Sequence, residues 1–270
     1  MQSLRNLALA GAAALAFAPA AVLGADLPAP VYKAPIIEEF GGWYLRGDIG
    51  MSNQQVKKLD SPAFDASVVV LAKGFDSAPI FGVGIGYQYN SWLRFDLTSE
   101  WRGGATFRGL DTFDNGGTPN SNDYHGTKTE WLTLFNGYLD LGTWNSITPY
   151  VGAGVGFSRN TISNWRDLNI NAPGGAVAFA NSKSQWDFAW ALHAGISYKV
   201  APNFLVDLSY RYVHLGDASS DDMIGFDGSN GTFNPIRLKG ISSNDFRLGV
   251  RWMFADNFYP SYDPPLVRKY

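Results

Sequence analysis

The body of the chain alternates hydrophobic and polar residues with a period of two, which is the pattern of half-exposed β-strands. Phe81, Val83 and Ile85, for example, share one face, and the glycines between them share the other. Eight stretches follow this pattern, at residues 43–52, 81–89, 93–102, 131–141, 150–157, 186–199, 206–212 and 245–254. The fourth stretch is less regular, because Leu132 and Leu134 fall on its otherwise polar face.

The connections between these stretches alternate in length. Three are short turns, at Asn90–Ser91, Gly142–Ser146 and Val200–Asn203. Four are long and polar, at residues 54–77, 103–128, 158–183 and 215–243. A tilted strand of about ten residues is long enough to cross a bilayer, and short turns alternating with long loops are typical of outer-membrane barrels.

We therefore predict an all-β fold, an eight-stranded antiparallel transmembrane up-and-down β-barrel, over residues 41–254. An even number of strands places both termini in the periplasm and the long loops outside the cell. The alternative is a soluble barrel with its apolar face inward. An export signal at residues 1–24, aromatic residues at the strand ends such as Trp43, Trp101 and Trp252, and the low proportion of charged residues favour the version in the cell outer membrane.

The two ends of the chain differ from the body. Residues 1–24 contain one cation, Arg5, followed by an apolar run and small residues, which is the pattern of a secretory signal peptide. Residues 25–40 are Pro-rich and predict an extended periplasmic linker. Residues 255–270 are also Pro-rich, which argues against a further regular strand and predicts a periplasmic tail.

Composition narrows the function classes. Only 17% of the residues are charged, against roughly 25% in ordinary soluble domains. The absence of cysteine excludes a disulfide scaffold and thiolate metal sites. A formal net charge of −3 argues against a large basic surface for nucleic acid.

The predicted inner face carries balanced charge, six bases and six acids. They are Arg46, Arg94, Arg102, Arg211, Arg247 and Arg251, with Asp48, Asp96, Glu100, Asp140, Asp187 and Asp207. Lys199 and Asp245 are set aside because they lie at strand ends. An eight-stranded barrel is just wide enough for its side chains to fill, and an unpaired buried charge is costly. We therefore predict an interior lattice of ion pairs, with inner glycines making room for it, and a plugged or very narrow pore.

Few residues suggest catalysis or ligand binding. His193 and Ser197 share a face with Asp187, but four residues along a strand span about 13 Å, too far for a nucleophile and its base. Tyr124 and His125 are weak candidates for haem ligands. Four loop aspartates, Asp217, Asp221, Asp222 and Asp227, lack the spacing of a calcium loop. We predict no enzyme activity, no cofactor and no metal.

Several motifs resemble one known family. They are the predicted mature start Ala25-Asp26-Leu27-Pro28, the segments 136–142 and 148–156, and the closing stretch 245–254. In this order they are similar to the alphaproteobacterial, rhizobial and brucella-type, outer-membrane immunogenic proteins, a group of OmpA-like β-barrel porins. The resemblance implies an abundant, surface-exposed, antigenic eight-stranded barrel, and some relatives are called porins or haemin binders. It also implies that an Ala-Asp amino terminus is joined covalently to peptidoglycan, here through Ala25 and Asp26.

The predicted function is structural: envelope integrity through peptidoglycan attachment, with surface antigenicity. A narrow porin for small solutes is the alternative, and a haem-binding or lipid-modifying barrel is less favoured. Expected partners are outer-membrane lipid and lipopolysaccharide, peptidoglycan and the barrel-assembly machinery. Phe254, at the end of the last stretch, and Tyr270, at the end of the chain, are the candidate assembly signals.

Overall fold

The computed structural model describes residues 41–172 and 176–254, and these form strands and turns. Among them no helix is long and apolar enough to cross a membrane. The predicted signal peptide, linker and C-terminal tail lie outside the described residues, so these three boundaries stay predictions.

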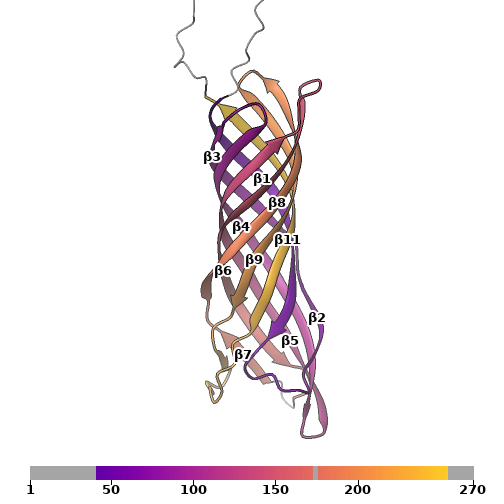
Figure 1. Cartoon of the computed structure of the whole chain (residues 1–270). Coiled ribbons are helices and arrows are strands. Elements are labelled where there is room, and N and C mark those ends of the chain that lie inside the picture. The colour runs from indigo at the N-terminus through magenta and orange to yellow at the C-terminus, as the bar shows by residue number, and fades with distance from the viewer. Residues whose placement is uncertain (1–40, 173–175, 255–270) are drawn as a thin grey trace, which may run out of the picture. The chain divides into compact units, whose positions relative to one another are not determined.

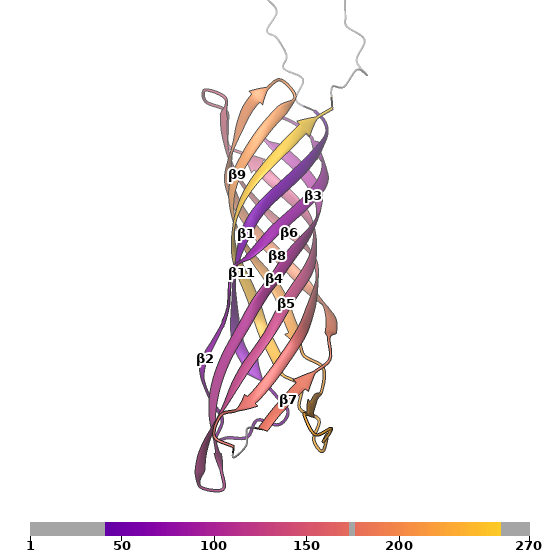
Figure 2. The ribbon, with the colours of Figure 1, turned by 180° about the vertical axis from the view of Figure 1, so that it is seen from behind.

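Eight long strands close into a barrel (Figure 1). They are β1 (Gly42–Asp60), β3 (Ala78–Gln88), β4 (Leu93–Asn115), β5 (Thr118–Asp140), β6 (Ile147–Asn169), β8 (Lys183–Ala201), β9 (Phe204–Ser219) and β11 (Arg237–Met253). Each pairs antiparallel with the next, and β1 pairs with β11 to close the seam (Figure 2). The predicted eight-stranded antiparallel up-and-down barrel is confirmed.

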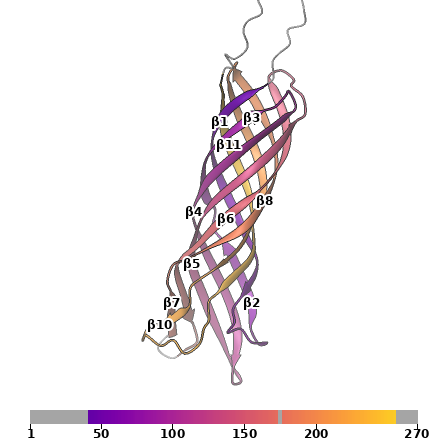
Figure 3. The same ribbon diagram turned by 60° about the vertical axis from the view of Figure 1, so that its left-hand side comes forward.

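The two ends of the barrel differ. At the turn end, three short connections join β3 to β4, β5 to β6 and β8 to β9. Asn90 shapes the first, where its Oδ1 accepts the backbone N–H groups of Trp92 and Leu93. At the loop end, three shorter strands extend the wall (Figure 3): β2 (Val69–Phe75) pairs with β4, β7 (Ala176–Ala180) with β6, and β10 (Met223–Gly225) with β7.

The prediction of four long loops is wrong for much of their length. Residues 103–128 are almost wholly strand, because β4 and β5 each run for 23 residues. They meet in a tight turn at Gly116 and Gly117, whose positive φ angles of 64° and 89° suit glycine. β1 and β6 likewise extend far into the ranges predicted as loops.

The outward side chains nearest the turn end are apolar and exposed, and we call this zone the apolar band. Ile49, Val83, Leu97 and Phe135 lie within it. Aromatic residues flank it, with Trp43, Tyr89, Tyr198 and Trp252 toward the turn end and Trp101, Trp131 and Trp186 on the other side. Aromatic girdles on both sides of an outward apolar zone are the arrangement of a membrane barrel.

Nearer the loop end the two faces exchange character. Phe107 and Leu238 are fully buried inside the barrel, whereas their neighbours Arg108 and Arg237 face outward. The wall there resembles that of a soluble barrel, with apolar residues in and polar residues out. This exchange explains the mistaken loops, because a strand with a polar outer face reads as a polar segment.

Candidate functional site in the barrel interior

Buried ion pairs fill much of the barrel, and we call the seven basic and seven acidic side chains that form them the ion-pair network. The bases are Arg46, Arg94, Arg102, Lys128, Arg211, Arg247 and Arg251, and the acids are Asp48, Asp96, Glu100, Glu130, Asp140, Asp207 and Asp245. All are buried. The structure thus brings together eleven of the twelve residues proposed from the sequence.

Two arginines and two acids form the centre of this network. The guanidinium of Arg211 donates to both carboxylate oxygens of Glu100, at 2.8 and 2.6 Å, and to Asp245 at 2.7 Å. Arg102 approaches Asp245 from the other side, with N–O distances of 2.7 and 2.9 Å. Arg102 also pairs with Glu130, which pairs in turn with Lys128. These bidentate contacts fix side chains from β4, β5, β9 and β11 across the lumen.

The network continues toward the turn end. Arg247 joins Glu100, at 2.7 Å, to Asp48, at 3.0 Å. Arg46 then pairs with Asp48 and with Asp96, each at 2.7 Å. These pairs are linked to one another, so the buried charges in them are compensated from more than one side. The pairs Arg94–Asp140 and Arg251–Asp207 stand apart from this linked series.

Arg94 and two tyrosines lie across the barrel near its turn end. The guanidinium carbon of Arg94 lies 4.2 Å from the ring centre of Tyr138 and 4.5 Å from that of Tyr150. Its Nε donates to Asp140 at 3.1 Å. Cation–π contacts of this kind hold a guanidinium where little water is present.

Two expectations about this interior need correction. Asp187 makes no ion pair among the described residues, and its carboxylate accepts the backbone N–H groups of Asp217 and Phe188 instead. Asp245, which the sequence argument set aside, is fully buried at the centre of the network. Lys128 and Glu130 were not proposed, although continuing the inward alternation of β5 beyond Leu132 would have found them.

Glycines on the inner face make room for the larger side chains. A Cβ on Gly82 would lie 2.9 Å from Cγ of Glu100. A Cβ on Gly86 would overlap the ring of Tyr44, and one on Gly152 would crowd the ring of Tyr138. The strands therefore approach the charged residues more closely than any larger residue would permit.

An apolar cluster closes the interior toward the loop end, and we call it the apolar plug. Its buried members toward the loop end include Val56, Phe107, Trp165 and Leu238. The rings of Phe107 and Trp165 stack with centroids 5.3 Å apart. Leu132 and Leu134, which interrupt the polar face of their strand, belong to the same cluster but lie beside the ion-pair network, nearer the turn end than Glu130.

The residues considered for catalysis are not brought together. Nε2 of His193 lies 3.1 Å from Oδ1 of Asn136, and Oγ of Ser197 accepts a hydrogen bond from Arg251. Asp187 is bonded to backbone, as described above. Each polar group is thus occupied by a structural partner.

The candidate ligands for haem and metal are also separated. Tyr124 is buried and donates to Asp111 at 2.7 Å, whereas its neighbour His125 faces outward. Within residues 41–172 and 176–254, no group of three or more His, Asp or Glu side chains is arranged to hold a metal ion. Burial raises the pKa of Asp167 to about 7, and the nearby Asp111 and Asp123 add to this effect.

Of the candidate assembly signals and the proposed anchor, only Phe254 lies among the described residues. Phe254 is exposed directly after β11, and its N–H donates to the carbonyl of Trp43 at 2.9 Å. Tyr270, Ala25 and Asp26 lie outside the described residues.

Comparison with known proteins gives consistent matches. The model of a family described as "Outer membrane protein beta-barrel domain" matches residues 7–254. An uncharacterized protein of Brucella abortus is 29% identical, covering 83% of this chain and 89% of its own length. A putative adhesin of Rickettsia typhi is 30% identical, covering 78% and 87%. The crystal structure of Neisserial surface protein A covers 79% of this chain and 97% of its own, with 18% identity and a TM-score of 0.43.

Proposed function

The chain belongs to the family of outer membrane protein beta-barrel domains, and on this basis we propose that it is a closed, structural barrel rather than a channel. The observation that carries the proposal is the filled interior. The ion-pair network occupies the lumen nearer the turn end, and the apolar plug follows it toward the loop end. An eight-stranded barrel has little lumen beyond what such side chains occupy.

The orientation is part of the proposal. Short turns face the periplasm and longer connections face outward in barrels of this class. The turn end, where β1 begins and β11 ends, would therefore face the periplasm. The loop end would stand at the cell surface, accessible to antibodies, which agrees with an antigenic role.

Conductance tests the closed barrel directly. We expect purified, refolded protein in planar bilayers to show no openings or only rare ones, because charged and apolar side chains obstruct the lumen. A general porin of about 16 strands, inserted in the same bilayer, serves as the positive control. Steady, frequent openings of the folded barrel would contradict the proposal and favour the narrow porin.

We also propose that the barrel is attached to the cell wall through its mature amino terminus, at Ala25 and Asp26. The Pro-rich segment 25–40 lies between that terminus and the barrel. An extended polyproline-type segment of this length spans about 50 Å, at roughly 3.1 Å per residue. Such a span carries the amino group well away from the membrane surface, toward the peptidoglycan.

Mass spectrometry checks this attachment. Barrels released from cell walls by muramidase are expected to carry a muropeptide on the α-amino group of Ala25. The variant Asp26→Ala keeps the segment length but removes the acidic residue of the Ala-Asp pattern. It should reduce the fraction of the protein that carries a muropeptide. An unmodified Ala25 amine in all of the released wild-type protein would refute the attachment and leave the closed barrel unaffected.

A further inference from the structure

Three asparagines in the chain are followed directly by glycine: Asn115, Asn136 and Asn230. Such an asparagine can lose its side-chain amide without an enzyme, because the backbone nitrogen of the next residue attacks the side-chain carbonyl carbon. Glycine favours this attack, since it has no side chain and leaves the backbone the most freedom. The reactivity of each site therefore depends on how firmly the fold keeps the two atoms apart.

Asn136 is held on all sides within the wall of the barrel. It pairs with Asp96 of β4 on one side and with Gly154 of β6 on the other. Its amide nitrogen donates to Asp96 at 2.8 Å, and its amide oxygen lies 3.1 Å from Nε2 of His193. Reaction at Asn136 would require the core of the barrel to open, and core strands open rarely.

Asn115 is exposed but belongs to the tight turn between β4 and β5. It is the last residue of β4 and pairs with Thr118. Between these two residues lie Gly116 and Gly117, both with positive φ angles, and the N–H of Gly117 donates to Asp114 at 2.7 Å. The turn therefore restrains the backbone on both sides of Asn115.

Asn230 lies in the exposed connection between β10 and β11, in a stretch that belongs to no strand. The attacking atom here would be the backbone nitrogen of Gly231, whose N–H makes no hydrogen bond among the described residues. A Cβ built on Gly231 would meet no atom within 4 Å, so the space around it is open. The fold thus places little restraint on the approach of the two reacting atoms.

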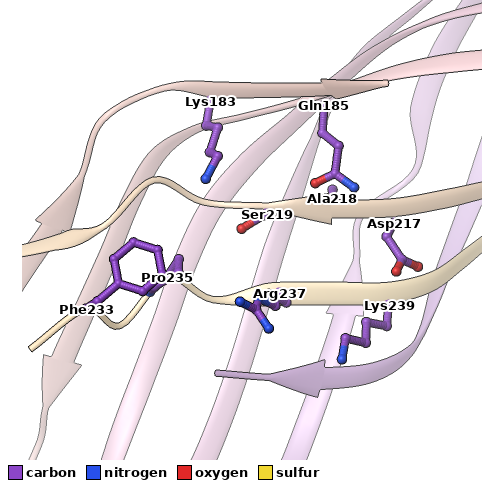
Figure 4. Close-up of a pocket in the computed structure, with 9 residues that line it drawn as sticks. All are labelled: Lys183, Gln185, Asp217, Ala218, Ser219, Phe233, Pro235, Arg237 and Lys239. Atoms are coloured by element: carbon purple, nitrogen blue, oxygen red, sulfur yellow. The ribbon is translucent and has the colours of Figure 1, made fainter. Parts of the chain in front are cut away.

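The two ends of this connection are fixed, in contrast to its middle. Asp222 accepts the backbone N–H of Asn234 at 2.8 Å, and this bond closes the neck of the loop. Next to the neck, Phe233 and Pro235 border a pocket of about 260 Å³ together with Lys183 of β8 (Figure 4). A change in the middle of the loop therefore lies close to a defined set of contacts.

We propose that Asn230 is a site of spontaneous deamidation in the folded protein. The nitrogen of Gly231 forms a bond to Cγ of Asn230, and the bond from Cγ to Nδ2 breaks. The proton of the Gly231 nitrogen goes to the departing amide, which leaves as ammonia, and the product is a cyclic succinimide. Water then opens this ring at one of its two carbonyl carbons and gives aspartate or isoaspartate.

The product places a second carboxylate beside Asp222. The backbone N–H of Asn234 lowers the pKa of Asp222, and the side-chain amide of Asn230, which also faces that carboxylate, adds to this effect. Deamidation replaces the amide with a like charge, which disfavours the ionised form of its neighbour. The loop-end surface gains one negative charge, and the neck of the loop is weakened.

The test follows all three sites in one sample. Folded, full-length barrel in detergent micelles is aged in mildly alkaline buffer, digested, and analysed by mass spectrometry with fragmentation that distinguishes isoaspartate. Asn230 is expected to convert fastest and Asn115 more slowly. Asn136 should convert at least about a hundredfold more slowly than Asn230, because it reacts only when core strands open. Heat-modifiable mobility in gels shows that the aged protein is still folded.

Two controls separate the effect of the fold from that of the sequence. In urea the three sites should convert at similar rates, since each is followed by glycine. The variant Gly231→Ala adds a methyl group where the fold has open space, and it should slow conversion of Asn230 several-fold while leaving Asn115 unchanged. Equal rates at Asn230 and Asn136 in the folded barrel, or an equally wide spread of rates in urea, would overturn the proposal.

Discussion

Replacing Arg102 with methionine is expected to lower the free energy of unfolding by about 3–5 kcal/mol, the cost of removing one partner from a buried ion pair. The guanidinium donates to Asp245, to Ser52 and, as an ion pair, to Glu130. Methionine fills much of the same space but leaves two carboxylates with fewer partners. Urea unfolding of the barrel in lipid vesicles measures the difference.

The control for this variant is Arg108→Met on the same strand. Arg108 faces outward with its side chain 71% exposed, and its contact with Asp76 is 4.0 Å long. Its replacement is expected to change stability by at most about 0.5 kcal/mol. Equal small effects at both positions would mean that water reaches the interior charges, and the ion-pair network would then not seal the lumen.

The variant Trp165→Ala is expected to cost about 3–5 kcal/mol, the range for removing a large buried aromatic side chain. Trp165 is 1% exposed and stacks on Phe107 within the apolar plug. The strand opposite cannot fill the space easily, since the nearest residue is Gly126, whose missing Cβ admits the indole ring. Thermal or urea unfolding measures the loss of stability.

Hydrogen exchange locates the same effect along the barrel. Because the apolar plug lies toward the loop end, the backbone amides in the loop-end halves of β4, β5 and β6 are expected to exchange faster in Trp165→Ala. Amides around Arg46 and Asp96 should change little. Phe226→Ala serves as the comparison, since Phe226 is 84% exposed. A uniform loss of protection along the strands would show that the plug and the ion-pair network unfold as one unit.

The strand order and the facing of side chains were predictable because alternation directly reports which residues share a face. The length of the strands was not, since beyond the apolar band their outward residues are polar and no longer mark a membrane-facing strand. Phe107 and Trp165 continue the alternation with the opposite sense. Apolar side chains face outward in the apolar band, as in a membrane barrel. Nearer the loop end they face inward, as in a soluble barrel, so each of the two alternatives describes one part of the wall.

For the interior residues, alternation predicts which side chains face inward but not which of them contact one another. Arg211 and Glu100 follow from alternation alone, although their 111-residue separation gives no sign of the contact between them. Asp187 departs from the expectation because β8 and β9 stop pairing at Trp190 and His214, just before Gly216 adopts a φ of +72°. The sequence has no pattern that marks this local break.

The exchange of polarity along the wall has a consequence for assembly. In the proposed orientation, outward cations such as Lys57, Arg108 and Arg159 have to traverse the hydrocarbon before they reach the cell surface. A lysine or arginine on the lipid face costs about 2–4 kcal/mol at the bilayer midplane, so a finished cylinder would face a large translocation barrier. A pathway in which the loop-end half crosses before β1 and β11 pair would avoid this barrier.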